Sequence, residues 1–314
     1  MKKNLGILIQ LAIVLGMFCG CAGSCPVSEL STANASEACY FLVEGELYHN
    51  EKPVDKHSTE LVLDGCHLDS FEFLRDFTEL TRLDLVGTNI SDLSILKSLP
   101  NLKYLHISCC ENITDVSVVG ELDSLIELVL TELPVSDISQ LEKLNLKRLS
   151  LYFMSNIKNI DVIRQMTTLE SLSLWGTGVN DITALENLKE LRYLELAHTP
   201  ITDISSIKGL IKLEVLNLIE CSQPVDLTPL SGLINMRELD LPPCESFDLS
   251  IIKEMKGLES FGATAVETPF DDITVLAEME RLSSIRLWWV TGEQMVWLDK
   301  HFPNANIIAS VIEE

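Results

Sequence analysis

Apolar residues recur at every third position over long stretches of this chain, and the run then begins again. Between residues 86 and 105 they stand at Ile90, Leu93, Leu96, Leu99, Leu102 and Leu105. A step of three fits neither an α-helix, with 3.6 residues per turn, nor a half-buried strand, which alternates every two residues. It fits a 3₁₀ or extended return segment that directs one side chain per turn into a core.

The same pattern returns at residues 175–194 and 197–216, each time after a short L-x-L pair. The first members of these pairs lie 21 to 24 residues apart: Leu61, Leu83, Leu105, Leu128, Leu149, Leu172, Leu194, Leu216, Leu239, Phe261 and Ile285. Self-similarity at this period, built on such a pattern, indicates leucine-rich repeats. The sequence therefore predicts an α/β-type solenoid: a leucine-rich repeat horseshoe of about ten 22-residue repeats, with a parallel sheet on its concave face and a cap at each end.

In each repeat we expect the L-x-L pair to be a short strand whose two leucines face inward. One repeat cannot bury its leucines alone, so stacked neighbours must share one core. An Asp or Asn precedes nine of the return segments and can cap them by accepting hydrogen bonds from the next backbone N–H groups. These residues are Asp92, Asp115, Asp137, Asn159, Asp181, Asp203, Asp226, Asp248 and Asp272. We interpret them as structural caps rather than as a catalytic or calcium-binding array.

The repeat form G-T-x-I-x-D-I-x-x-L-x-x-L-x-x-L-x-x-L-x-L resembles that of the internalin class of bacterial leucine-rich repeat proteins. The resemblance covers residues 59–282 and is specific for the fold rather than for the function. The chain carries no LPxTG sorting signal and shows no second domain after the repeats. The identity of a receptor is therefore not carried over.

The first residues are expected to be a targeting signal rather than part of the fold. Lys2 and Lys3 precede an apolar stretch of residues 5–18, which is too short for a comfortable membrane span. The following F-C-G-C resembles a bacterial lipobox, which implies a signal peptide at 1–20, cleavage before Cys21 and lipid attachment to Cys21. Ordinary secretion and an uncleaved anchor are the alternatives, and Cys25 is a weaker rival acceptor.

The rest of the chain then divides into a lipid anchor and flexible tether (21–38), an N-terminal cap (39–58), the repeats (59–282), and a last strand with the C-terminal cap (283–314). We expect the protein to be exported, lipid-anchored to the bacterial cell envelope and exposed at the cell surface.

Charge and cysteine positions exclude several functions. A net charge of −24 and a pI near 4.5 argue against a nucleic-acid partner, since phosphate binding needs clustered Lys and Arg. The cysteines at one repeat slot are expected to be buried thiols, namely Cys66, Cys110, Cys221 and Cys244. No metal-ligand spacing is present, so no metal site is predicted. Cys25, Cys39 and Cys109 remain without an assigned role, and a Cys25–Cys39 bridge is one option.

Catalysis is not expected. The six histidines are scattered over different elements, and no H-x-x-x-H pair, G-x-S-x-G elbow or phosphate-binding glycine loop is present. His106 and Asp84 are predicted to be neighbours on adjacent strands, as an exposed polar pair. We therefore predict a protein that is not an enzyme and needs no cofactor.

Residues that flank the inward leucines should form the concave face, where solenoids typically bind. Because adjacent strands lie roughly 4.8 Å apart, Tyr152 and Trp175 should be neighbours, with Tyr193 one repeat further and across the strand. The predicted ligand-binding residues are Tyr152, Trp175, Tyr193, Ile219, Arg148 and Glu195. Clustered aromatics resemble a binding hot spot for a protein partner, such as a surface protein of a host or neighbouring cell. Mutual packing of the aromatics, a glycan ligand and a structural envelope scaffold remain open alternatives.

Overall fold

A computed structural model describes residues 40–312, except 50–51, 222–225, 245–247 and 266–269. Strands β1 (Tyr40–Val43), β2 (Glu46–His49) and β3 (Lys52–Pro53) form a small antiparallel sheet. Leu47 of β2 belongs to the main hydrophobic core, so this small sheet is packed against the repeats.

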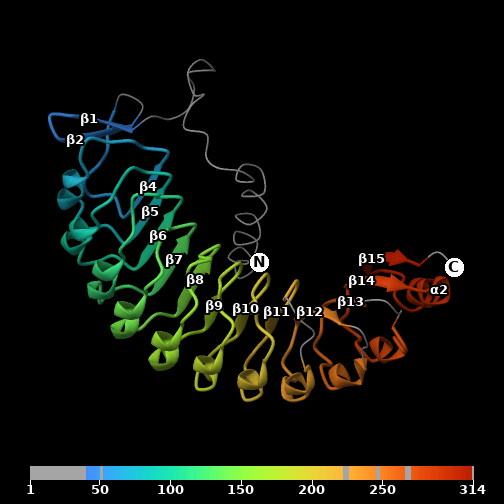
Figure 1. The fold of residues 1–314 in the computed structure, drawn as a ribbon. Coiled ribbons are helices and arrows are strands. Elements are labelled where there is room, and N and C mark those ends of the chain that lie inside the picture. Colours follow the sequence, from blue (N-terminus) through green and yellow to red (C-terminus); the bar gives the residue numbers. More distant parts are fainter. Residues whose placement is uncertain (1–39, 50–51, 222–225, 245–247, 266–269, 313–314) are drawn as a thin grey trace. The chain divides into compact units, whose positions relative to one another are not determined.

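Within the described residues, twelve strands form one parallel sheet in simple sequence order (Figure 1). They are β4 (Glu60–Asp64), β5 (Arg82–Val86), β6 (Tyr104–Ser108), β7 (Glu127–Thr131), β8 (Arg148–Tyr152), β9 (Ser171–Ser173), β10 (Tyr193–Glu195), β11 (Val215–Asn217), β12 (Glu238–Cys244), β13 (Ser260–Ala265), β14 (Ser284–Val290) and β15 (Asn306–Val311). The register places equivalent leucines side by side, as with Leu172, Leu194 and Leu216. The expected solenoid is therefore confirmed.

Each return segment contains a short 3₁₀ helix, in agreement with the step of three (Figure 1). They are η1 (Glu72–Asp76), η2 (Ser94–Ser98), η3 (Ser117–Glu121), η4 (Ser139–Lys143), η5 (Asp161–Gln165), η6 (Thr183–Leu185), η7 (Ser205–Ile207), η8 (Thr228–Gly232), η9 (Leu249–Ile252) and η10 (Thr274–Glu278). Each lies between two successive strands of β4–β14, which gives ten repeats in the described part of the chain.

The Asp and Asn caps make the hydrogen bonds that the sequence predicts. Asp92 Oδ1 accepts from the N–H of Ser94 at 2.8 Å, and Asp203 Oδ1 accepts from the N–H of Ser205 at 2.7 Å. The same bond, two residues along, is made by Asp115, Asp137, Asn159, Asp181, Asp226, Asp248 and Asp272. These bonds satisfy an N–H group at the start of nine of the ten return segments, η2 to η10, and the Ser70 hydroxyl accepts the equivalent bond from the Glu72 N–H at η1, so the column is structural.

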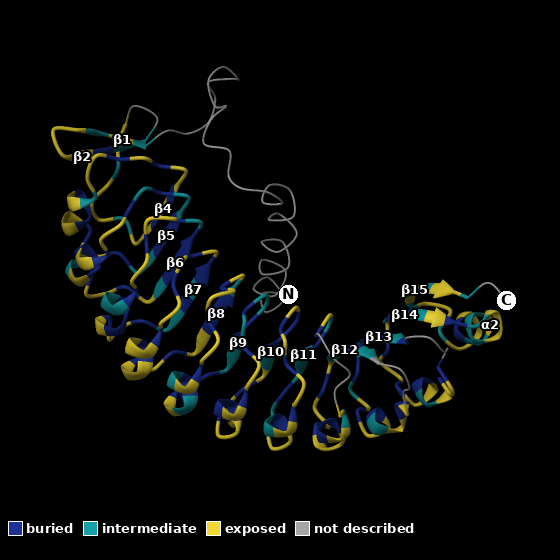
Figure 2. Cartoon of the chain, viewed as in Figure 1, coloured by how far each residue is buried: buried dark blue, intermediate teal, exposed yellow. Residues whose placement is uncertain are grey.

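One continuous core runs through all the repeats (Figure 2). Leu83, Leu85 and Leu105 on the strands are fully buried, and Leu96 and Leu102 on the return segment are buried equally. Burying one such side chain contributes about 1.5–3 kcal/mol. Stability therefore comes from stacking, since each leucine is covered by the repeats on either side.

The C-terminal end carries the helix α2 (Gly292–His301) between β14 and β15. A capping box starts it: the Thr291 hydroxyl accepts from the Gln294 N–H, and the Gln294 side chain accepts from the Thr291 N–H. Leu298 is fully buried, and Trp297 and Phe302 pack against the core. The helix thus covers apolar surface at the end of the array.

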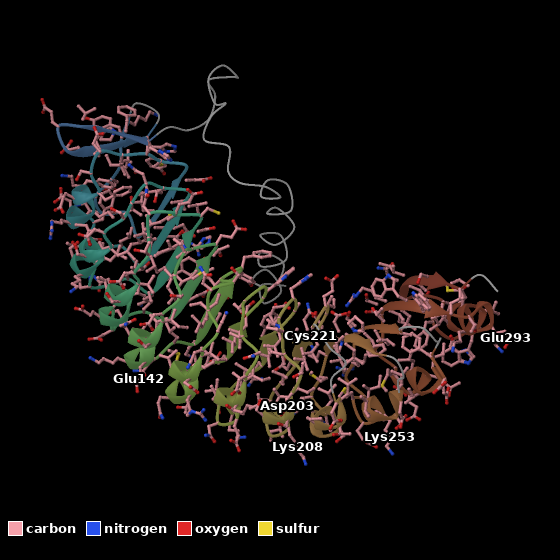
Figure 3. The ribbon with its side chains drawn as sticks, viewed as in Figure 1. Glu142, Asp203, Lys208, Cys221, Lys253 and Glu293 are labelled. Atoms are coloured by element: carbon pink, nitrogen blue, oxygen red, sulfur yellow. The ribbon has the colours of Figure 1, made fainter. Side chains whose placement is uncertain are left out.

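The outer, helical side of the repeats is polar. Glu142, Lys208 and Lys253 lie there in exposed positions (Figure 3). Among the described residues, no helix is both long enough and apolar enough to cross a membrane.

The cysteine column follows its prediction where it is described. Cys66, Cys110 and Cys221 are buried, and the side chain of Cys244 lies outside the described atoms. Cys25 and Cys39, with the bridge considered between them, also lie outside the described residues.

Candidate functional site

The strands end in a column of residues with left-handed backbone. Glycine fills this slot at Gly65, Gly87 and Gly176, with φ between 58° and 67°. In other repeats the slot holds a residue with a side chain: Cys109, Glu132, Phe153, His198, Glu220 and Trp289. This conformation costs a non-glycine residue about 1–2 kcal/mol. The array therefore holds strained side chains along the edge of the concave face.

An aromatic cluster forms where two columns meet, and it consists of Tyr152, Phe153, Trp175 and His198. Tyr152 ends β8, and its ring lies 6.5 Å from that of Trp175 in an edge-to-face arrangement. Phe153, from the left-handed column, lies 5.9 Å from the same indole. His198 stacks on the indole from the next repeat at 5.6 Å and 5°. The predicted contact between Tyr152 and Trp175 is present, and two further rings enclose Trp175.

Contacts with rings hold Trp175 in place. Its Nε1 atom is buried without a hydrogen-bond partner among the described residues. Nδ1 of His198 lies 3.2 Å from Oε2 of Glu220. Phe153 remains 42% exposed. The cluster thus presents apolar rings beside a carboxylate.

Tyr193 and Glu195 lie together on β10, but the carboxyl group is not exposed. The Tyr193 hydroxyl donates to Oε2 of Glu195 at 3.1 Å, and the Ala197 N–H donates to Oε1 at 3.3 Å. Glu195 is only 5% exposed, and burial raises its pKa to about 7 in spite of these bonds. Burial also raises the pKa of the Tyr193 hydroxyl. Glu195 therefore holds the Tyr193 hydroxyl from a buried position, and its carboxyl group changes protonation near neutral pH.

The other two predicted residues lie apart from the rings. Arg148 forms an ion pair with Glu127 on the neighbouring strand. Ile219 is half-buried two repeats from Trp175, with buried Ala197 in the same slot between them. The structure therefore brings Tyr152 together with Trp175 and Tyr193 together with Glu195, and the Tyr152 hydroxyl lies within electrostatic reach of both residues of the second pair.

Phe153 is the functional candidate that the sequence reasoning did not select. A signal was available, because a large aromatic residue occupies a slot that holds glycine in the first repeats and in the very next repeat, at Gly176. His198, which is not among the predicted ligand-binding residues, is also an integral part of the cluster.

The Asp84–His106 pair is present but is not exposed, so that expectation was wrong. Nδ1 of His106 lies 3.1 Å from Oδ1 of Asp84, in the register of β5 and β6. Arg82 donates to both oxygens of Asp84 and lies 3.7 Å above the ring of Tyr104. These two long side chains cover the pair. In the described part of the protein, Nε2 of His106 has no hydrogen-bond partner, and no three potential metal ligands come together.

Comparisons with known proteins agree with the architecture. A family described as leucine-rich repeats (2 copies) matches residues 78–121 and 189–232. The internalin inlF from Listeria monocytogenes is similar in structure, with 26% identity, a TM-score of 0.63, and coverage of 83% of this chain and 85% of that one. Internalin C2 from the same organism has 26% identity and a TM-score of 0.51, over 62% of this chain and 83% of that one.

A third structure, TLR13 in complex with ssRNA13, shares the fold at 17% identity and a TM-score of 0.51, over 74% of this chain and 40% of that one. No curated protein matches the sequence. The chain thus has the leucine-rich repeat fold and is similar in structure to these two Listeria internalins.

Proposed function

We propose that this protein is a non-enzymatic binding module that recognises a protein partner through the aromatic cluster on its concave face. One observation carries the proposal: Phe153 keeps a large, 42% exposed ring in a left-handed backbone position, next to Trp175. Strained backbone that persists often does so at functional sites. Glycine would relieve the strain but would remove the ring.

The composition of the cluster fits protein recognition. Aromatic side chains are enriched at protein interfaces and among the few residues that provide most of the binding energy there, and the contacts around those residues exclude water. Here the rings of Tyr152, Phe153 and Trp175 lie beside His198 and the carboxylate of Glu220. A partner would bury the rings and orient itself on this carboxylate. The likeness to internalins supports a recognition role.

Location and attachment form part of the same proposal. The lipobox-like sequence would place a lipid on Cys21, with residues 21–38 as the tether to the cell envelope. Cys21 and the signal segment lie outside the described residues. Residues 39–58 and 283–314 would close the two ends of the core, for which the packing of Leu47 and Leu298 gives support.

A capture experiment with matched tryptophan variants tests the proposal. The purified protein and its Trp175→Ala and Trp289→Ala variants are immobilised and exposed to surface extracts of neighbouring or host cells. Trp289 is a suitable control because it is an even more exposed tryptophan, at 44%, and lies outside the aromatic cluster, in the last repeats. Bound proteins are identified by mass spectrometry.

We expect one protein to be retained by the wild type and by Trp289→Ala, and to be lost with Trp175→Ala. Equal retention by all three would refute the assignment to the aromatic cluster. Retention that survives protease treatment of the extract but not removal of its glycans would favour a sugar ligand. A stable protein that captures nothing from any extract would favour the scaffold role.

A further inference from the structure

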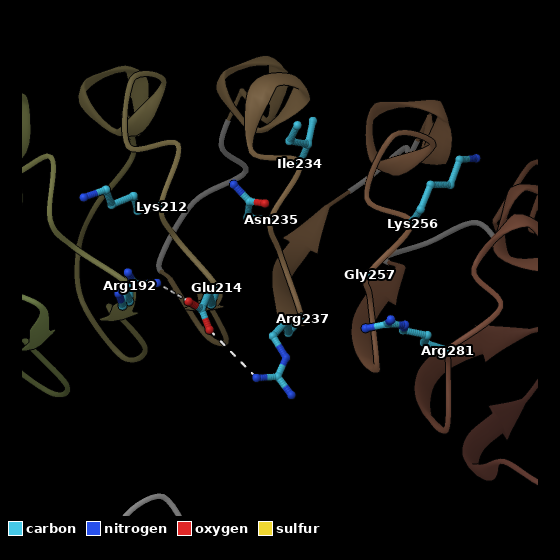
Figure 4. A pocket seen from close by; sticks show the side chains of 9 residues that line it. All are labelled: Arg192, Lys212, Glu214, Ile234, Asn235, Arg237, Lys256, Gly257 and Arg281. Carbon is cyan, nitrogen blue, oxygen red and sulfur yellow. Dashed lines mark hydrogen bonds and ion pairs between the residues drawn. The ribbon is translucent and has the colours of Figure 1, made fainter. Parts of the chain in front are cut away.

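A second surface, on the opposite edge of the sheet, has the form of a binding groove. Its lining residues come just before strands β10 to β14, whereas the aromatic cluster lies where strands end. The groove has a volume of about 680 Å³ (Figure 4). A hollow lies at Gly257, because glycine has no side chain where the same repeat position carries a long side chain in Lys212, Asn235 and Arg281.

The groove is basic although the chain carries a net charge of −24. Five cationic side chains line it, and only one carboxylate does. Four of the cations have a carboxylate partner in an adjacent repeat: Arg192 with Glu214, Lys212 with Glu190, Arg237 with Glu259, and Lys256 with Glu278. Arg281 has no ion pair among the described residues. The groove therefore keeps an excess positive charge at Arg281.

The existing ion pairs are open to exchange. The side chains of Lys212, Arg237 and Lys256 are 42–52% exposed, and exposed ion pairs contribute only about 0–1 kcal/mol. Arg237 already holds Glu259 through two nitrogen atoms, at 3.0 and 3.2 Å. A guanidinium group of this geometry can donate two N–H groups to an incoming carboxylate in the same way. The cations can thus turn from their own glutamates to a ligand.

Apolar surface lies among these charges. Ile234 lines the groove and is 55% exposed, and Ile211, in the same slot one repeat earlier, is 61% exposed. A simple inorganic anion would make no use of either side chain. An apolar residue with acidic neighbours matches both features.

We propose that this groove binds an acidic segment of a protein partner. Carboxylates of the segment would contact Arg281 and Arg237, and an apolar side chain between them would rest on Ile234 over the hollow at Gly257. A long polyanion is a poorer match, because its remaining charges would meet an acidic surface. The groove works independently of the aromatic cluster, so either surface can be tested alone.

Fluorescence anisotropy with a labelled peptide tests the proposal. The probe is Glu-Glu-Leu-Glu-Glu, and the full-length protein is titrated into it at low and at physiological salt. Arg281→Ala removes the unpaired cation, and Gly257→Gln fills the hollow. A side chain is tolerated at Gly257, because an added Cβ would meet only the carbonyl oxygen of Met236 at 3.6 Å. Lys147→Ala is the matched control, since Lys147 forms an equivalent pair with Glu170 outside the groove.

We expect binding that weakens as salt rises, and a loss of about tenfold in affinity with Arg281→Ala and with Gly257→Gln, which corresponds to about 1.4 kcal/mol. Lys147→Ala should bind as the wild type does, and all three variants should keep its melting temperature. No binding by the wild type at low salt would overturn the proposal. So would an equal loss with Lys147→Ala, or unchanged binding in both groove variants. Displacement of the peptide by an equal concentration of short-chain polyphosphate would overturn the choice of a protein segment.

Discussion

The left-handed column can be tested by adding a single methyl group. Gly87 has φ of +58°, and a Cβ built on it would lie 3.9 Å from its nearest neighbours, both backbone atoms of Gly65. Gly87→Ala therefore introduces backbone strain without a clash. The strain amounts to about 1–2 kcal/mol, while alanine also stiffens the unfolded chain by about 0.4–1 kcal/mol in the opposite direction. The net expectation is a loss of about 0.5–1 kcal/mol.

Gly176→Ala should cost more than Gly87→Ala. Its φ is +67°, and its Cβ would lie 2.9 Å from Cδ1 of Phe153, so the strain is joined by a contact that displaces the ring. Gly232→Ala is the control, because its backbone is not left-handed and the nearest atom to its Cβ is 4.0 Å away. That variant should gain a few tenths of a kcal/mol.

Urea unfolding followed by circular dichroism measures these differences from the shift in midpoint at constant slope. The order of stability should be Gly232→Ala, wild type, Gly87→Ala and Gly176→Ala. A Gly87→Ala variant more stable than the wild type would refute the strain argument. Equal losses for Gly87→Ala and Gly176→Ala would refute the packing of Phe153 beside Gly176.

Three further predictions follow from buried and capping groups. Leu196→Asp should reduce the free energy of unfolding by about 3 kcal/mol or more, because Leu196 is fully buried and the new charge would be unpaired. The melting temperature should fall sharply, and an unchanged melting temperature would contradict the strand register. Asp203→Ala should destabilise the protein at pH 7, because the Ser205 N–H loses the carboxylate that accepts its hydrogen bond. The backbone hydrogen bond from Ser205 lowers the pKa of Asp203, so the stabilisation that Asp203 provides is present above its pKa in the unfolded chain and is lost as pH falls through its pKa in the folded protein. The variant and the wild type should therefore converge in stability in acid. A constant difference down to pH 2 would contradict the capping role of Asp203. Glu195→Gln should become progressively more stable than the wild type as pH rises from about 4.5 to 7, because the raised pKa means that ionising Glu195 destabilises the fold. The difference should approach roughly 3 kcal/mol above pH 7, and urea midpoints that do not separate between pH 5 and pH 8 would exclude a buried carboxyl at this position.

Patterns that are local in sequence were sufficient to predict the fold. The step of three predicted the 3₁₀ return segments, and the L-x-L spacing predicted the strands and their register. Both predictions work because every repeat packs its leucines against equivalent residues of its neighbours. The Asp caps were predictable for the same reason, since Asp203 and its acceptor bond to Ser205 are only two residues apart.

Details that depend on side chains lying across neighbouring strands were not predictable. Glu195 was predicted to be a ligand-binding residue, but it is buried and bonded to the Tyr193 hydroxyl, and this burial raises its pKa, which composition alone does not predict. The contact between Asp84 and His106 was predicted correctly, but the pair was predicted to be exposed and is buried. The side chain of Arg82, which bonds to Asp84, covers the pair. The left-handed backbone of Phe153 needed the strand ends to be aligned before the position could be compared with Gly176.

Because the strands of the sheet follow the order of the sequence, the protein can be shortened or lengthened by complete repeats. Each strand pairs only with its neighbours in sequence, so deleting or duplicating one complete repeat joins two compatible edges and preserves every cap and every leucine layer. A repeat removed within β11–β13 would shorten the basic groove by one strand spacing of about 4.8 Å and leave the aromatic cluster intact. The two surfaces can therefore be lengthened, shortened or lost separately, through an exchange of repeats that leaves the rest of the core in place.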